Sequence, residues 1–236
     1  MIKHWITGGC SFSEPPWAWP TLVHQQLGAT VRFYPTAMSS QGNGLISRKI
    51  IWQCQQLLNQ HNANEMFVGV MWSGPNRHDF YYRDDPGFTG NMHGWRENPT
   101  RFVDGGEGAW VIMNPHWQMG SCQAWYSKFH DDVGAVIYTL EHILRTQWFL
   151  KNAGIPYVMS TYMDAVIPVW CQTHPDTAHL WQMLDHDHFL PITGLYEWCQ
   201  DSTDIDFRED DKHPVPEHQK LFVDQVMWPF IKEKYV

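Results

Sequence analysis

The sequence predicts one α/β domain, 1–236, in which a central parallel sheet is covered by helices on both faces. Residues 66–72 (MFVGVMW) form a continuous apolar run, which is typical of a strand buried on both faces of a parallel sheet. Other short apolar runs alternate with segments whose apolar residues recur at helical spacing, as in folds built from βα units. A chain of 236 residues is long enough for one such domain with a sizeable core.

The first part of the chain is predicted to hold two strands and a helix. Residues 4–7 form a short apolar run before two glycines, so we expect a buried strand that enters a tight turn. Residues 17–27 are predicted to be a helix, with a proline near its start. Residues 30–34 are predicted to be a second strand, and 39–44 a polar, glycine-rich loop.

Two longer helices and a strand are predicted from apolar spacing. The first of these helices is predicted to bury Ile46, Ile50, Cys54, Leu57 and Leu58. The second spans 131–151 and ends at Asn152-Ala153-Gly154, and a strand over 155–160 follows it. Its buried side is predicted to carry Val133, Val136, Ile137, Leu140, Ile143, Leu144 and Trp148.

Two regions lack this regular alternation. Residues 73–126 are rich in Gly, Asn, Asp, Trp and Tyr with little periodicity, so we interpret them as a long insert after the third strand. Residues 164–199 contain one predicted helix, 176–184, and no other clear element. A last helix is predicted to begin near Pro216.

Composition narrows the class of function. The net charge is −9, which argues against a nucleic-acid partner because phosphate binding needs a basic surface. The first apolar run is too short for a secretory signal, and no apolar run approaches the ~18 residues of a membrane span, so we expect neither a secretory signal nor a membrane partner. Five scattered cysteines without a Cys-x-x-Cys pair favour a reduced, cytoplasmic protein, although release or virion association would leave no mark in the sequence.

The residues suited to catalysis follow the predicted strands. Loops at the carboxyl ends of parallel strands meet at one edge of the sheet. Ser11 follows the first strand, and Asp210 and His213 stand just before the last helix. Acyl transfer needs a nucleophile, a base that takes its proton, and a group that orients the base. Asp210 is three residues before His213, so a one-turn loop can place the carboxylate beside the imidazole.

An oxyanion hole is predicted from three donors in these loops. They are the backbone amides of Ser11 and Gly42 and the side-chain amide of Asn76, and they would stabilise the charge that develops on a carbonyl oxygen. Glycine at 42 would let that oxygen approach the backbone closely. In an alternative interpretation, Asn76 is a plain loop residue and Ser73 or a backbone amide takes its place.

The same residues resemble the sequence blocks of the SGNH (GDSL-like) hydrolases. Gly42 is similar to the glycine of the second block, and the order, spacing and distance of the last block from the C-terminus agree. The other matching blocks are Gly9-Cys10-Ser11-Phe12 (first), Gly74-Pro75-Asn76 (third) and Asp210-x-x-His213-Pro214 (fifth). The sequence departs from the family where Cys10 replaces the usual aspartate and where Arg77 follows Asn76 in place of a common aspartate.

The resemblance implies a three-layer, flavodoxin-like sandwich and hydrolysis of an ester or thioester without a cofactor. Many members of the family remove acetyl groups from carbohydrates. The first blocks also resemble an uncharacterised phage-type branch of such proteins. We therefore expect a serine esterase that acts on an O-acyl group, with an acylated small molecule or glycan as its partner. The alternative is a carbohydrate-binding or virion-associated module that keeps the fold without turnover.

Three rival sites are weaker. Cys10 could be a thiolate nucleophile, but in the family that it resembles this side chain points away from substrate. Residues 185–188 (Asp-His-Asp-His) have metal-ligand types, but adjacent residues rarely converge on one ion, so no metal is expected. His218 has no aspartate at matching spacing and is predicted to lie on the last helix. The acidic run 204–211, apart from Asp210, is predicted to be solvated surface.

The insert has two interpretations. It leaves the third strand at the catalytic edge and carries flat side chains suited to sugar faces, which favours a substrate groove built with Trp95, Trp110 and Tyr81. Alternatively, the insert packs on the sheet edge and buries those aromatic side chains. The 14 Trp of the chain have the same two interpretations: they form part of the core, or some of them stack on sugar rings. The other aromatic residues considered for the groove are Tyr82, Trp117 and Trp125.

Overall fold

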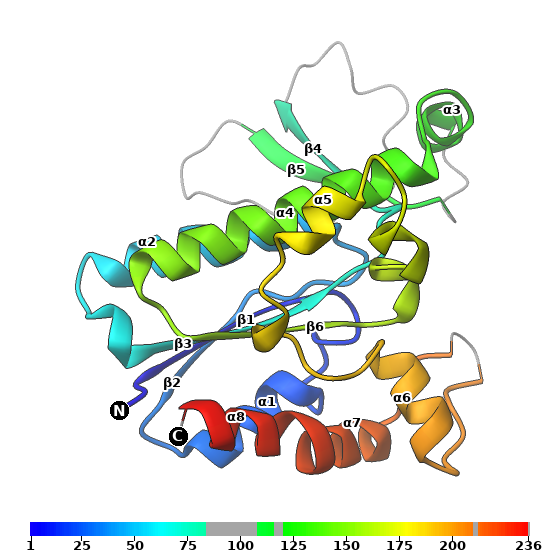
Figure 1. Cartoon of the computed structure of the whole chain (residues 1–236). Coiled ribbons are helices and arrows are strands. Elements are labelled where there is room, and N and C mark those ends of the chain that lie inside the picture. The colour runs from blue at the N-terminus through cyan, green and yellow to red at the C-terminus, as the bar shows by residue number, and fades with distance from the viewer. Residues whose placement is uncertain (84–107, 116–119, 210–211, 236) are drawn as a thin grey trace.

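Four parallel strands form the central sheet of the protein, in the order β2-β1-β3-β6 (Figure 1). The structure is a computed structural model, and it describes residues 1–83, 108–115, 120–209 and 212–235. The strands are β1 (His4–Gly8), β2 (Arg32–Pro35), β3 (Met66–Trp72) and β6 (Tyr157–Thr161). β1, β3 and β6 are buried along their whole length, as the apolar runs predicted, whereas β2, at one edge of the sheet, is half-exposed.

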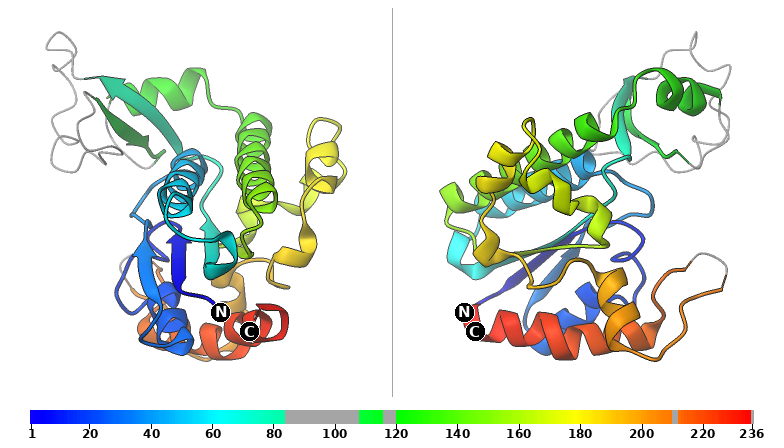
Figure 2. Two further views of the ribbon diagram at one scale, coloured as in Figure 1. Left: turned by 90° about the vertical axis from the view of Figure 1, so that its left-hand side faces the viewer. Right: turned by 45° about the vertical axis from the view of Figure 1, so that its right-hand side comes forward.

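Helices cover both faces of the sheet, so the predicted three-layer α/β class is confirmed. On one face lie α2 (Asn43–Leu58) and α4 (Asp132–Ala153), and on the other lie α1 (Trp19–Leu27), α7 (Pro216–Phe222) and α8 (Trp228–Tyr235) (Figure 1). A π-helical turn, Val223–Met227, joins α7 to α8. The two termini lie close together at the amino end of the sheet (Figure 2).

Each face of the sheet has its own hydrophobic core. The α2–α4 core packs residues such as Ile46, Ile50, Leu140 and Leu144 against β3. In the α1–α7 core, the rings of Trp5 and Trp19 are both fully buried. A Cβ at Gly69 would lie 2.4 Å from the Trp5 ring, so the one glycine inside β3 makes room for these two indoles. At least these tryptophans belong to the core and not to a binding surface.

The predicted ends of α4 and most of its predicted buried face agree with the structure, although Val133 and Ile137 are only half-buried. Asp131 caps the helix by accepting from the amide of Gly134 at 2.8 Å, and Gly154, with a φ of 71°, ends it in the left-handed conformation. Val136, Leu140, Ile143 and Leu144 are buried as predicted. Trp148, however, is 51% exposed, so its predicted burial is wrong. Gln147 and Leu150 fill the inner face there and turn Trp148 towards solvent.

The insert has more regular structure than its sequence predicted. β4 (His78–Arg83) and β5 (Gly108–Met113) pair antiparallel as a separate two-stranded sheet, and α3 (Gly120–Lys128) follows them. These elements lie beyond the N-terminal ends of α2 and α4 (Figure 2). Later in the chain, α5 (Ala178–Gln182) is shorter than predicted and α6 (Leu195–Ser202) was not predicted. None of the helices described is long and apolar enough to cross a bilayer.

Candidate active site

Ser11 and His213 meet at the carboxyl edge of the central sheet. Ser11 lies in the turn after β1, and His213 lies between α6 and α7. The Oγ of Ser11 and the Nε2 of His213 are 2.7 Å apart, which is hydrogen-bond distance. Both residues are partly exposed, so a substrate can reach them. A neutral imidazole in this position can accept the serine proton.

Gln219 couples the serine loop to the helix that follows His213. This buried side chain of α7 donates from Nε2 to the backbone oxygen of Phe12 at 3.1 Å. Its Oε1 accepts from the amide of Trp19, the first residue of α1, at 2.9 Å. The rings of Phe12 and His213 also pack together, with centroids 4.8 Å apart. These contacts connect the segments of Ser11 and His213, although the two residues come from opposite ends of the chain.

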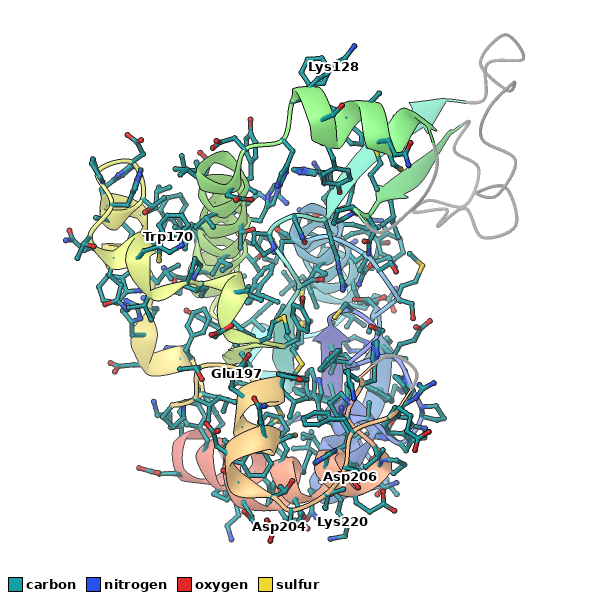
Figure 3. All side chains as sticks on the ribbon, turned by 90° about the vertical axis from the view of Figure 1, so that its right-hand side faces the viewer. Lys128, Trp170, Glu197, Asp204, Asp206 and Lys220 are labelled. Atoms are coloured by element: carbon teal, nitrogen blue, oxygen red, sulfur yellow. The ribbon has the colours of Figure 1, made fainter. Side chains whose placement is uncertain are left out.

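A tight turn presents His213. The amide of Arg208 donates to the backbone oxygen of His213 at 3.1 Å, and the amide of Lys212 donates to the backbone oxygen of Arg208 at 3.0 Å. Lys212 has a φ of 57°, in the left-handed region that few residues other than glycine adopt. Asp210 lies outside the described residues, so its place in the triad stays a prediction. Asp204 and Asp206, earlier in the acidic run, are exposed on the outer surface as predicted (Figure 3).

The second loop, residues 39–42 before α2, places backbone amides against a carboxylate that lies beyond the third loop, residues 73–77 after β3. Gly42 caps α2, and its amide donates to Oδ1 of Asp79 at 3.1 Å, while the amide of Leu45 donates to Oδ2 at 2.9 Å. The first amides of a helix lack partners within the helix, so a carboxylate is favourable there. A Cβ at Gly42 would lie 2.5 Å from the backbone oxygen of Arg77. Glycine therefore permits close packing of the third loop at this point.

The third loop joins the same edge of the sheet. The hydroxyl of Tyr126 lies 2.6 Å from the backbone oxygen of Asn76, to which it donates. Arg77 donates from Nη1 to Oγ of Ser73 at 2.8 Å, and its guanidinium lies 5.4 Å from the ring centroid of Tyr162. The ring of Tyr162, just after β6, packs edge-on against Phe12 with centroids 4.9 Å apart. The Ser11 loop and the Asn76 loop thus approach one another around Tyr162.

Asn43 connects the second loop to the third. Its Oδ1 accepts from the backbone amide of Ser73 at 2.7 Å, and its Nδ2 donates to the backbone oxygen of Ser73 at 2.8 Å. The same Nδ2 lies 3.1 Å from Oγ1 of Thr139 on α4. Asn43 and Ser73 are both buried. One asparagine side chain therefore joins the start of α2 to the end of β3 and to α4.

Sequence reasoning missed the supporting residues Asn43, Asp79, Tyr126 and Gln219. Asn43 had a weak signal, because it follows Gly42 directly at the start of a predicted helix. The others had none. The contact between Asp79 and Gly42 spans 37 positions and that between Gln219 and Phe12 spans 207, so no local pattern could indicate either of them.

The rival residues have other surroundings. His218 is fully buried, accepts from the amide of Val215 at 3.2 Å and contacts Oγ1 of Thr203, and burial lowers its pKa. Cys10 is fully buried beside the nucleophile turn. Asp185 pairs with Lys151, with 2.6 Å between Oδ2 and Nζ. Within the described ranges, no group of three or more metal-ligating side chains is arranged around a common point.

The aromatic residues of the insert differ in exposure. Tyr81 on β4 is 57% exposed. Trp125 on α3 packs edge-on against Phe80 at 4.9 Å and lies 5.3 Å from the ring of Phe129, so it belongs to an aromatic cluster. Trp95 lies outside the described residues, as do Trp117 and the side chains of Tyr82 and Trp110. Both interpretations of the insert therefore stay open.

Comparisons with known proteins bear on the fold. No family model and no curated protein matches the sequence. Among solved structures, the chain is similar to TesA, with a TM-score of 0.51, 9% sequence identity and coverage of 98% of this chain and 99% of that one. A second match is a member of the lipolytic protein G-D-S-L family from Veillonella parvula DSM 2008, with a TM-score of 0.45, 11% identity and coverage of 99% and 98%. The similarity to TesA extends over nearly the whole of both chains and supports the predicted three-layer α/β fold.

Proposed function

We propose that the protein is a serine esterase that hydrolyses an O-acyl ester, with Ser11 as nucleophile, His213 as base and Asp210 as the carboxylate that orients the base. The observation that carries the proposal is the 2.7 Å distance between Oγ of Ser11 and Nε2 of His213. A serine and a histidine at this distance, partly exposed at the carboxyl edge of a parallel sheet, have the geometry that acyl transfer requires.

The proposed reaction has two halves. His213 takes the proton of Ser11 while the serine oxygen attacks the ester carbonyl, and the imidazolium then protonates the departing alcohol. This leaves an acyl-serine. A water molecule then attacks the acyl carbon as His213 takes its proton, and the carboxylic acid departs while the proton returns to Ser11. No cofactor is needed, because each proton removed is returned within the cycle.

The oxyanion hole of this proposal uses the amides of Ser11 and Gly42 and the side-chain amide of Asn76. The amide of Gly42 already donates to Asp79 at 3.1 Å, so it would serve both acceptors. Each such donor is worth about 10²–10³ in kcat in serine hydrolases.

The proposed substrate class is an acylated carbohydrate, with acetyl as the acyl group. Exposed Tyr81 supports it, because a flat ring at the edge of the insert can stack on a sugar face. Trp95 and Trp110 are proposed as further stacking residues. A phage origin, with release or virion association, would fit a glycan substrate and is proposed only on the resemblance of the first blocks.

Hydrolysis of p-nitrophenyl acetate tests the proposed activity, and the proposal predicts turnover by the wild-type protein. Ser11→Ala should abolish this turnover without changing the melting temperature, and Cys10→Ala should retain it. Retained turnover in Ser11→Ala with loss in Cys10→Ala would assign the nucleophile to the thiol. Acetylated and deacetylated polysaccharide, compared by acetate release, test the substrate class separately.

A further inference from the structure

We propose that Asn43 and Asp79 are positioning residues that together form a reciprocal clamp between the Gly42 loop and the segment that carries Asn76. The clamp sets the spacing of these two loops around the Ser11–His213 pair. This inference rests on the proposed esterase function, because positioning matters only if the loops serve a reaction. Neither residue belongs to a sequence block by which the chain resembles a hydrolase.

The first half of the clamp runs from α2 to the end of β3. Asn43 binds both backbone polar groups of Ser73, its amide at 2.7 Å and its carbonyl oxygen at 2.8 Å. Two antiparallel hydrogen bonds from one planar amide fix direction as well as distance. Ser73 begins the loop that leads to Asn76, so the position of that loop depends on Asn43.

The second half runs in the opposite direction, from β4 back to α2. Asp79 receives the amides of Gly42 and Leu45, one on each carboxylate oxygen, at 3.1 and 2.9 Å. Asn43 of α2 thus binds the backbone of Ser73 in the third loop. Asp79 of β4, beyond that loop, binds backbone amides at the start of α2. Because each segment holds the other, a displacement of one loop should displace the other as well.

Burial of Asp79 disfavours the charged form of its carboxylate. Burial raises the pKa of Asp79 to about 6, although both amide hydrogen bonds and the cations of Arg48 and Lys49 oppose that change. A buried carboxylate is tolerated when it satisfies backbone donors that would otherwise lack partners. Asp79 thus fixes the amide of Gly42, which is one of the groups that the proposed reaction needs in place.

Three variants test the clamp. Asn43→Ala removes both bonds to Ser73, and Asp79→Asn keeps the size of the side chain but loses one of its two acceptors. Thr139→Val is the matched control, because it lies in the same buried patch and removes only the bond of Asn43 to α4. The measurements are kcat and KM for p-nitrophenyl acetate at a temperature where every variant is fully folded, together with hydrogen exchange of the Gly42 and Leu45 amides.

The clamp predicts a fall in kcat of about 10–100-fold in Asn43→Ala and in Asp79→Asn, with KM changed less than about threefold, because small displacements at a reacting centre cost rate. Thr139→Val should keep kcat within about twofold of wild type. Exchange at Gly42 and Leu45 should become faster in Asp79→Asn. A purely structural role would lower the melting temperature and leave kcat of the folded protein unchanged.

Three results would overturn the inference. Wild-type kcat in both clamp variants would mean that the contacts only stabilise the fold. A higher kcat in Asp79→Asn would mean that Asp79 withholds the Gly42 amide from substrate instead of positioning it. Absence of turnover in the wild-type protein, equal to that in Ser11→Ala, would overturn the esterase itself and the clamp's role with it. Failure of the function therefore shows in the wild type, and failure of the clamp shows only in the variants.

Discussion

The hydroxyl oxygen of Ser11 lies 2.7 Å from Nε2 of His213, although 202 positions separate the two residues in the chain. Ser11 lies just after β1 and His213 lies in the turn before α7, and Gln219 forms a hydrogen bond between the two segments. A contact between such distant segments forms only when the whole sheet and its helices are in place. The pair therefore links the chemistry proposed for the protein directly to its fold.

A double-mutant cycle tests whether the two residues act as one unit. Ser11→Ala and His213→Ala should each lower kcat by about 10⁴–10⁶-fold, and the double variant should be no slower than the slower single variant. The reason is that the base has no task once the nucleophile is gone. The measurement is kcat on p-nitrophenyl acetate, and losses that multiply in the double variant would show that the residues act independently.

Gln219→Leu should lower both stability and turnover. The leucine has a similar size but leaves the amide of Trp19 and the backbone oxygen of Phe12 without their partner, at a cost of about 2–4 kcal/mol in the free energy of unfolding. Urea unfolding measures this loss. Gln55→Leu, at an exposed position of α2, is the control and should change stability by less than about 0.5 kcal/mol. Equal effects of the two substitutions would contradict the coupling role.

Asp79 should make stability depend on pH in a defined direction. Burial raises the pKa of its carboxyl from 3.8 to about 6, so the folded protein holds this proton more tightly than the unfolded chain does. The stabilisation is complete below about pH 4 and is lost as pH rises through 6. The cations of Arg48 and Lys49 on α2 act on this carboxylate. His142 of α4 is also near, since a Cβ at Gly44 would lie 3.4 Å from Oδ2 of Asp79 and 3.1 Å from Nε2 of His142.

The matched variant for this effect is Asp79→Asn, which cannot ionise. The free energy of unfolding of the wild type minus that of Asp79→Asn should decrease between pH 4 and pH 7, by an amount on the order of 3 kcal/mol. Urea unfolding at several pH values measures the difference, and other titrating groups cancel in it. A difference that stays constant, or one that increases with pH, would be inconsistent with a raised pKa at Asp79.

Much of the fold was predictable because its signals are local. The apolar run over 66–72 matches β3 residue for residue, and Gly154 ends α4 where the sequence predicted. The order of the Ser11, Gly42, Asn76 and His213 segments was also predictable, because parallel βα units place the loops after successive strands at one edge.

The remaining features depend on contacts that no local pattern encodes. β4 and β5 pair across a long stretch of chain, and their sequences lack clear alternation, so the insert was interpreted as aperiodic. Trp148 was placed on the buried side by spacing alone, whereas the packing of Gln147 and Leu150 turned it outwards. Asp79 binds the backbone of Gly42, and Asn43 binds the backbone of Ser73. Neither contact could be predicted, because each forms only when the two loops come together in the fold.

Tyr81 offers a test of the substrate groove. Tyr81→Ala should lower turnover of a large acetylated glycan by about tenfold, which corresponds to about 1.4 kcal/mol of lost binding free energy. Turnover of p-nitrophenyl acetate and the melting temperature should change little, because a stacking ring contacts only the sugar chain. Tyr138→Ala on α4 is a suitable control, since both tyrosines are 57% exposed. Equal loss on both substrates, or equal effects of the two variants, would favour the packing interpretation of the insert.

Covalent labelling of Ser11 is the most direct test of the central claim. A fluorophosphonate reacts with a serine hydroxyl that a neighbouring base has activated, and mass spectrometry of the digested protein identifies the labelled residue. We expect one adduct per chain, on Ser11, absent from Ser11→Ala and slowed by orders of magnitude in His213→Ala. No adduct on the folded wild-type protein, or an adduct on Cys10 in its place, would contradict the assignment of Ser11 and His213 as nucleophile and base.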